Sequence, residues 1–233
     1  MDLNLPVLEQ VSACENLLIA GMGGGFDVFY GLPIYFELCR RGKRVHLANY
    51  SFADLQLFDG GIRLSDTLLG VTADYEGVVI YFPELHLSRW FHQKRREDMT
   101  IWCFQKTGAA PLLKNYEMLV EHLGIDGILL IDGGVDSLVR GDESDTGTLI
   151  EDAISLFAVN ELTRVRTRIV GCTAFGAEQD LARLWCLCAA SSSPSSIFDS
   201  SAVVVGGIEV RRIYFPNLWC AKRSSSNLCT ELC

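Results

Sequence analysis

Short apolar runs rich in β-branched residues alternate along this chain with longer amphipathic stretches, and this alternation restricts the fold more than any other feature. The predicted strands span residues 16–21, 44–49, 77–82, 100–104, 127–132 and 167–173. The predicted helices span residues 27–41, 84–97, 111–123, 148–161 and 177–188. Continuous apolar strands bounded by helices are typical of parallel sheets covered on both faces. The pattern therefore predicts an α/β protein with a Rossmann-like three-layer fold and a mostly parallel sheet.

Two segments depart from this alternation. Within residues 51–74, Asp59-Gly60-Gly61 has the composition of a turn, which predicts a hairpin or an insertion there. From about residue 186 the chain becomes rich in serine and cysteine and loses both helical and strand periodicity. We expect one Rossmann-like domain at residues 1–185 and a poorly ordered, atypical tail at 186–233. A truncated or altered chain end would produce the same abrupt change.

The charge of the chain argues against two classes of partner. The 233 residues carry a formal net charge of -9, and the pI is near 4.9. Binding to nucleic acid or to anionic lipid needs clustered Lys and Arg, whereas the one basic cluster, Lys94-Arg95-Arg96, is followed directly by Glu97 and Asp98. No apolar run approaches the roughly 18 residues of a membrane span, and no signal peptide is recognisable. We therefore expect a cytoplasmic protein that binds neither nucleic acid nor membrane, and its oligomeric state is left open.

The first candidate site is the glycine-rich loop in residues 17–31, which read LLIAGMGGGFDVFYG. A predicted strand enters four glycines and a helix follows from Asp27. Glycine lets the backbone approach a ligand closely, and the free N–H groups of a helix start favour an anion. We expect Asp27 to act catalytically, by orienting the ligand or a general base. The residues expected to bind a phosphate-bearing or sugar-like ligand here are Gly21, Gly23, Gly24 and Gly25.

This loop departs from the known nucleotide-binding motifs. In the spacing GxGxxG, Phe26 stands at the third glycine position, and Asn49 ends the second strand where an acid would hold a ribose. The Lys-Ser/Thr pair of a P-loop is missing as well. These departures disfavour a standard NAD dehydrogenase and a P-loop ATPase. A plain strand-to-helix turn without a ligand is the alternative interpretation.

The second candidate site is the acidic loop that follows the strand at 127–132. Asp132 stands at the carboxyl end of that strand, where open α/β sheets bind ligands, and a buried acid there needs a hydrogen bond or a cation. Three interpretations stay open: a Mg²⁺ or Ca²⁺ site, hydrogen bonds to sugar hydroxyls, and a solvated acidic face. The expected metal ligands are Asp132, Asp136 and Asp142, of which Asp132 and Asp136 are also catalytic candidates. The expected ligand-binding residues are Gly133, Gly134 and Arg140.

Further features belong to the same predicted edge of the sheet. Thr148 and Glu151 have the spacing of a capping box at the start of the next helix. Lys106 follows the strand at 100–104 and could meet a phosphate or remain solvated. A third small-residue turn follows the strand that ends at Gly171. Because loops after parallel strands converge on one edge, they predict a pocket there.

Four segments together resemble an uncharacterised archaeal and bacterial family known as domain of unknown function 1152. The segments are GMGGGFDV (21–28), DGGVDSLVRGDESDTGT (132–148), EDA (151–153) and GCTAFGAE (171–178), and the resemblance covers roughly residues 15–183. It implies a Rossmann-like α/β fold and carries no established activity or catalytic residue. Members of the family continue helically after the position of Glu178, where this chain enters its serine- and cysteine-rich tail.

Three functional hypotheses follow from these residues. The first is an enzyme that acts on a nucleotide or a sugar phosphate, as a transferase or hydrolase assisted by a metal such as Mg²⁺. The second is a non-catalytic nucleotide-sensing module that uses the same pocket. The third is an incomplete homologue without activity.

Overall fold

The computed structural model describes residues 6–77, 79–134, 137, 147–173 and 204–207. Its strands are β1 (Asn16–Gly21), β2 (Arg44–Ser51), β3 (Ile62–Ser65), β4 (Leu68–Val71), β5 (Ile101–Gln105), β6 (Gly127–Asp132), β7 (Thr167–Cys172) and β8 (Val204–Gly207). Its helices are α1 (Pro6–Gln10), α2 (Asp27–Tyr30), α3 (Leu32–Arg40), α4 (Pro83–Trp90), α5 (Ala109–Leu123) and α6 (Leu149–Glu161), with short helical turns η1 (Leu55–Leu57) and η2 (Phe91–Arg95). The predicted helix at 177–188 and most of the tail at 186–233 lie outside the described residues.

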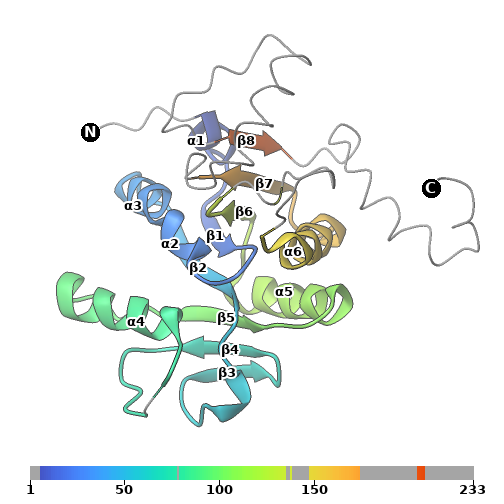
Figure 1. The fold of residues 1–233 in the computed structure, drawn as a ribbon. Coiled ribbons are helices and arrows are strands. Elements are labelled where there is room, and N and C mark those ends of the chain that lie inside the picture. Colours follow the sequence, from blue (N-terminus) through green and yellow to red (C-terminus); the bar gives the residue numbers. More distant parts are fainter. Residues whose placement is uncertain (1–5, 78, 135–136, 138–146, 174–203, 208–233) are drawn as a thin grey trace, which may run out of the picture.

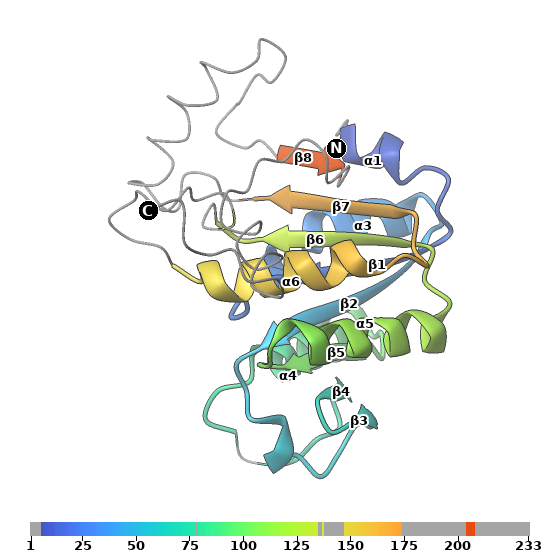
Figure 2. The ribbon, with the colours of Figure 1, turned by 90° about the vertical axis from the view of Figure 1, so that its right-hand side faces the viewer.

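The strands form one eight-stranded sheet in the order β3-β4-β5-β2-β1-β6-β7-β8. The central strands β5, β2, β1, β6 and β7 are parallel to one another, whereas the pairs β3–β4, β4–β5 and β7–β8 are antiparallel. The predicted α/β fold with a mostly parallel sheet is thus confirmed. From β1 the chain builds outward through β2 to β5, then returns to the other side of β1 for β6 and β7 (Figure 2). Strand order therefore reverses at β1, and ligands of open α/β sheets bind beside such a reversal.

Helices cover both faces of the sheet, as the alternation of side chains along a strand requires. In β1, Leu17 and Ile19 pack into the core beneath α3 and α4, while Leu18 and Ala20 pack into the core beneath α5 and α6. Figure 1 shows α3 and α4 on one side of the central strands and α5 and α6 on the other. None of the helices in the described ranges has the length and apolar character needed to cross a membrane.

The described residues of the predicted strand at 77–82, which are 77 and 79–82, form no strand, and β4 occupies the position in the sheet beside β5. Residues 79–82 instead lead into α4, with Phe82 buried and Ile80 exposed. The antiparallel pair β3–β4 supplies a hairpin within residues 51–74, but its turn lies at Asp66 and Thr67 rather than at Asp59-Gly60-Gly61, which precede β3.

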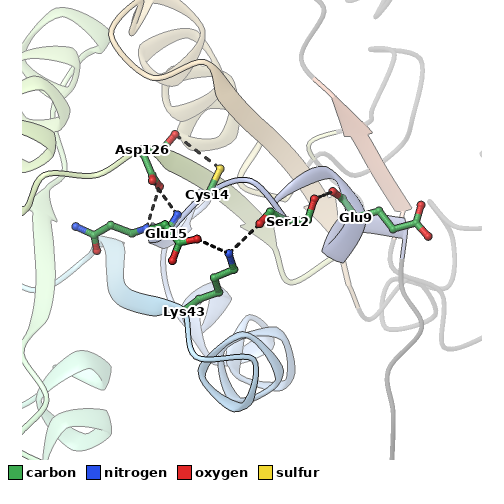
Figure 3. A network of polar contacts seen from close by, with 7 residues as sticks. Glu9, Ser12, Cys14, Glu15, Lys43 and Asp126 are labelled. Carbon is green, nitrogen blue, oxygen red and sulfur yellow. Dashed lines mark hydrogen bonds and ion pairs between the residues drawn. The ribbon is translucent and has the colours of Figure 1, made fainter.

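A hydrogen-bond network closes the amino end of the β1–β6 pair (Figure 3). The carboxylate of Asp126, just before β6, accepts from the backbone N–H groups of Glu15 (2.8 Å) and Asn16 (3.0 Å) at the start of β1. Lys43 Nζ donates to the Ser12 carbonyl oxygen (2.8 Å) and pairs with the Glu15 carboxylate (3.0 Å). The first turn of the chain before β1 is thereby fixed to both neighbouring strands.

A buried asparagine on α5 holds the β3–β4 hairpin against the sheet. The side-chain amide of Asn115 donates to the Thr67 carbonyl oxygen (3.1 Å) and to Thr67 Oγ1 (2.9 Å), and its oxygen accepts from Ser65 Oγ (3.0 Å). We expect Asn115→Ala to lower the free energy of unfolding by about 1–3 kcal/mol, because the partly buried Ser65 and Thr67 lose their hydrogen bonds to the amide. Urea denaturation measures this change. The exposed neighbour Lys114 provides the control, and an Asn115→Ala loss no larger than that of Lys114→Ala would contradict the assignment.

Candidate functional site

The two predicted glycine loops lie side by side at the carboxyl edge of the sheet. Gly21 ends β1 and pairs with Ile131 of β6. One residue further, the Met22 N–H donates to the Ile131 carbonyl oxygen (3.0 Å). The first loop and the Asp132–Gly134 turn therefore begin next to each other, at the point where strand order reverses.

Asp27 joins the two loops through both oxygens of its carboxylate. Oδ2 accepts from the Gly23 N–H (2.6 Å) within the first loop, and Oδ1 accepts from the Gly133 N–H (3.1 Å) in the second. A side chain at the first residue of α2 thus holds a backbone group 106 positions further along the chain. In this structure the acid expected to act on a ligand fixes the relative position of the loops.

Gly23 and Gly24 are required by the packing of the first loop. A Cβ on Gly23 would lie 2.3 Å from Asp152 Oδ1 and 2.5 Å from Thr148 Oγ1, so the loop packs directly on the start of α6. Gly24 has φ +97°, and a Cβ there would lie 2.6 Å from the ring of Phe52. These contacts explain both glycines without a ligand, and of the four glycines in this loop only Gly25 is partly exposed.

Asp132 is buried and organises the second loop. Its Oδ1 accepts from the Gly134 N–H (2.7 Å), and its Oδ2 accepts from the N–H of Ser137 (3.2 Å) and from the Ser137 hydroxyl. Its carbonyl oxygen accepts from the Thr173 N–H after β7 (2.9 Å). The buried acid predicted at this strand end is therefore compensated by N–H and O–H donors.

Three predicted site residues, Asp136, Arg140 and Asp142, lie outside the described residues. The predicted metal site is represented only by Asp132 in the described ranges, and these ranges hold no group of three or more His, Cys, Asp or Glu side chains placed to bind a metal ion.

Asn49 and Glu84 form a buried polar pair beneath the first loop, which the sequence did not predict. Asn49, at the position expected to hold a ribose, is fully buried and donates from Nδ2 to the Gly25 carbonyl oxygen (3.1 Å) and to Glu84 Oε1 (2.7 Å). Glu84 is fully buried in the first turn of α4, and burial raises its pKa above the ordinary value, opposed in part by Asn49 and Ser51. The only signal in the sequence is an acid directly after Pro83, which is ordinary for a helix start.

The start of α6 differs from the predicted capping box. The Thr148 side chain does not cap the helix, and the Glu151 carboxylate pairs with Lys106 Nζ instead. The same ammonium group lies 5.0 Å from the centre of the Phe52 ring. Lys106 therefore brings positive charge from the end of β5 to the side of the first loop.

No family model, curated protein or solved structure matches this chain, and the resemblance to domain of unknown function 1152 accordingly stays a prediction from the quoted motifs.

We expect Asp27→Asn to destabilise the protein by about 1–3 kcal/mol. The amide keeps the size of the carboxylate but can accept from only one of the two N–H groups, and the other loses its partner. Urea denaturation beside the exposed-site variant Asp59→Asn measures the effect. Equal free energies of unfolding of the two variants would show that the link between the loops contributes nothing to stability.

Glu84→Gln should change the pH dependence of stability in a defined direction. Because the folded-state pKa of Glu84 is raised, its contribution to stability is complete below the unfolded-state pKa of about 4.3 and falls as the pH rises toward the folded-state pKa. Gln cannot ionise and retains the acceptor for Asn49. The free energy of unfolding of Glu84→Gln relative to wild type should therefore increase between pH 4 and 8.

Urea denaturation at several pH values measures that difference, with Glu117→Gln on the exposed face of α5 as the matched control. A difference between Glu84→Gln and wild type that stays constant with pH would contradict a raised pKa of Glu84 in the folded protein.

Proposed function

We propose that this protein binds a nucleotide or a sugar phosphate at the carboxyl edge of its sheet, between the loop Gly21–Asp27 and the loop Asp132–Gly134. The observation that carries the proposal is the reversal of strand order at β1, beside which both glycine loops lie and are joined by Asp27. Ligand sites of open α/β sheets form at such positions.

The order of the parallel strands supports a Rossmann-like assignment. Numbered along the chain, the five parallel strands β1, β2, β5, β6 and β7 stand in the spatial order third, second, first, fourth, fifth. This order agrees with the first five strands of dinucleotide-binding folds. The antiparallel additions β3–β4 and β8 lie at the two edges, away from the reversal.

The proposed phosphate position lies beyond Gly24, because the Gly23 and Gly133 N–H groups already donate to Asp27. Among the described residues, the N–H groups of Gly24 and Gly25 have no hydrogen-bond acceptor. Lys106 lies nearby and is half-exposed. Because an exposed ion pair contributes little to stability, Lys106 can leave Glu151 and pair with a phosphate instead.

Binding without turnover is the form of this function that the described contacts favour. Asp27 and Asp132, the catalytic candidates within the described ranges, both direct their carboxylates to backbone N–H groups of the loops. Metal-assisted transferase or hydrolase chemistry through Asp132, Asp136 and Asp142 is our second proposal, because a carboxylate does end the buried strand β6 at this edge.

A thermal-shift screen with AMP, NAD, ADP-ribose and ribose 5-phosphate, each with and without Mg²⁺, tests the proposal. A ligand at 100 times its dissociation constant should stabilise the fold by about 2.7 kcal/mol. Strengthening by Mg²⁺ would support the metal site, and ³¹P NMR of the recovered ligand distinguishes turnover from binding. No shift with any ligand, in a protein that melts cooperatively, would contradict the proposed function.

Two matched variants localise the binding. Asp27 and Asp126 each hold two backbone N–H groups at opposite ends of the β1–β6 pair. We expect Asp27→Asn to abolish the ligand-induced thermal shift at a ligand concentration that is saturating for wild type. Asp126→Asn should retain the shift even where it lowers the melting temperature, and loss of the shift in both variants would point to general destabilisation.

A further inference from the structure

Four large aromatic side chains stand half-exposed around the two glycine loops. We call Phe26, Tyr30, Phe52 and Tyr81 the aromatic rim, and their exposed fractions lie between 40% and 57%. They come from three separate segments: the β1–α2 loop with α2, the residue after β2, and the approach to α4. Contiguous exposed apolar surface is uncommon on soluble proteins and marks binding sites.

Two of the four rings lie directly on glycines of the predicted site, and the hydroxyl group of a third lies near another glycine. The Phe52 ring is 2.6 Å from the position that a Cβ on Gly24 would take, and the Tyr30 ring is 2.5 Å from that of Gly133. The Tyr81 hydroxyl is 3.7 Å from that of Gly25. The glycines therefore make room for rings as well as for a turn, and any longer side chain would displace them.

The fourth ring closes the rim over the start of α2. Phe26 meets Tyr81 edge-to-face, with their centroids 6.5 Å apart. Phe26 is also the residue at the third position of the glycine motif, where a glycine would allow close packing of helix and strand. The departure from that motif thus places an exposed ring beside the proposed ligand.

The charges around the rim fit a planar, hydrogen-bonding ring that carries a phosphate. Burial raises the pKa of Tyr81, and the nearby carboxyl groups of Glu84 and Asp27 raise it further. The Asp27 carboxylate, which accepts from the Gly23 and Gly133 N–H groups, places negative charge on this side. Positive charge lies on the other side, where Lys106 Nζ is 5.0 Å from the centre of the Phe52 ring. The amino group of a nucleobase can donate a hydrogen bond on the negative side near Tyr81. The phosphate of the same ligand can bind on the positive side near Lys106.

We propose that the aromatic rim is a base-stacking subsite, so that the ligand is a nucleotide rather than a plain sugar phosphate. This inference rests on the proposed function and adds the class of ligand to it. Stacking on aromatic side chains tolerates any base, because every base presents a π-face. The rim therefore selects for the presence of a base and not for its identity.

Calorimetric titration of the full chain with AMP and with ribose 5-phosphate tests the subsite. AMP should bind at least about tenfold more tightly, which is the contribution expected from one stacked base. Phe52→Leu and Tyr81→Leu keep an apolar side chain but remove the ring. Each should weaken AMP binding by about fivefold or more and leave ribose 5-phosphate within about twofold of wild type. Trp90→Leu makes the same change at an exposed ring on α4 and should alter neither affinity.

The outcomes separate this inference from the proposed function. Equal affinities for AMP and ribose 5-phosphate in wild type would overturn the subsite and leave the proposed function standing. AMP binding that is unchanged in both Phe52→Leu and Tyr81→Leu, with cooperative melts, would also overturn it. Binding of neither ligand would overturn the proposed function, and the subsite with it.

Discussion

The carboxylate of Asp27 holds the N–H of Gly23 with one oxygen and that of Gly133 with the other, and the arrangement of the candidate site depends on this link. Asp126 makes an equivalent pair of bonds at the amino end of the same two strands. The β1–β6 pair, where strand order reverses, is thus fixed at both ends by an aspartate. Among the described residues, only the carboxyl end combines this link with glycines, helix starts and exposed rings, and this combination supports the proposal that the carboxyl end is the binding edge.

The link between the loops has a chemical consequence. The Asp27 carboxylate already accepts from the N–H groups of Gly23 and Gly133, so the proposed ligand position lies beyond Gly24, near Lys106 and the aromatic rim. Beneath the same loop, Asn49 donates to the Gly25 carbonyl oxygen from inside the core and also donates to the buried carboxyl group of Glu84. These contacts hold the loop without a ligand, which would limit the entropy cost of the proposed binding.

The sequence predicted the central sheet well, because β1, β5, β6 and β7 are apolar runs buried on both faces. The sequence predicted a strand at residues 77–82 because they form an apolar run. Nothing in that run indicates that β4 occupies the position beside β5 in the sheet. The sequence singled out Gly23, Gly24 and Asp27 as candidate site residues, but could not predict the hydrogen bond that Asp27 accepts from the Gly133 N–H, which joins residues far apart in the chain. The sequence did not predict the roles of Glu84 and of the aromatic rim, because the burial of Glu84 and the convergence of the four rings arise only from tertiary packing.

The central claim is that the two glycine loops form one ligand site, and the most direct test is the ¹H–¹⁵N NMR spectrum of the chain during titration with AMP. The account predicts saturable shifts of the Gly24, Gly25 and Gly134 amide signals with a single dissociation constant, while the signals of Glu15 and Asn16 at the opposite edge stay in place. Shifts confined to one loop, or to residues away from both, would contradict it.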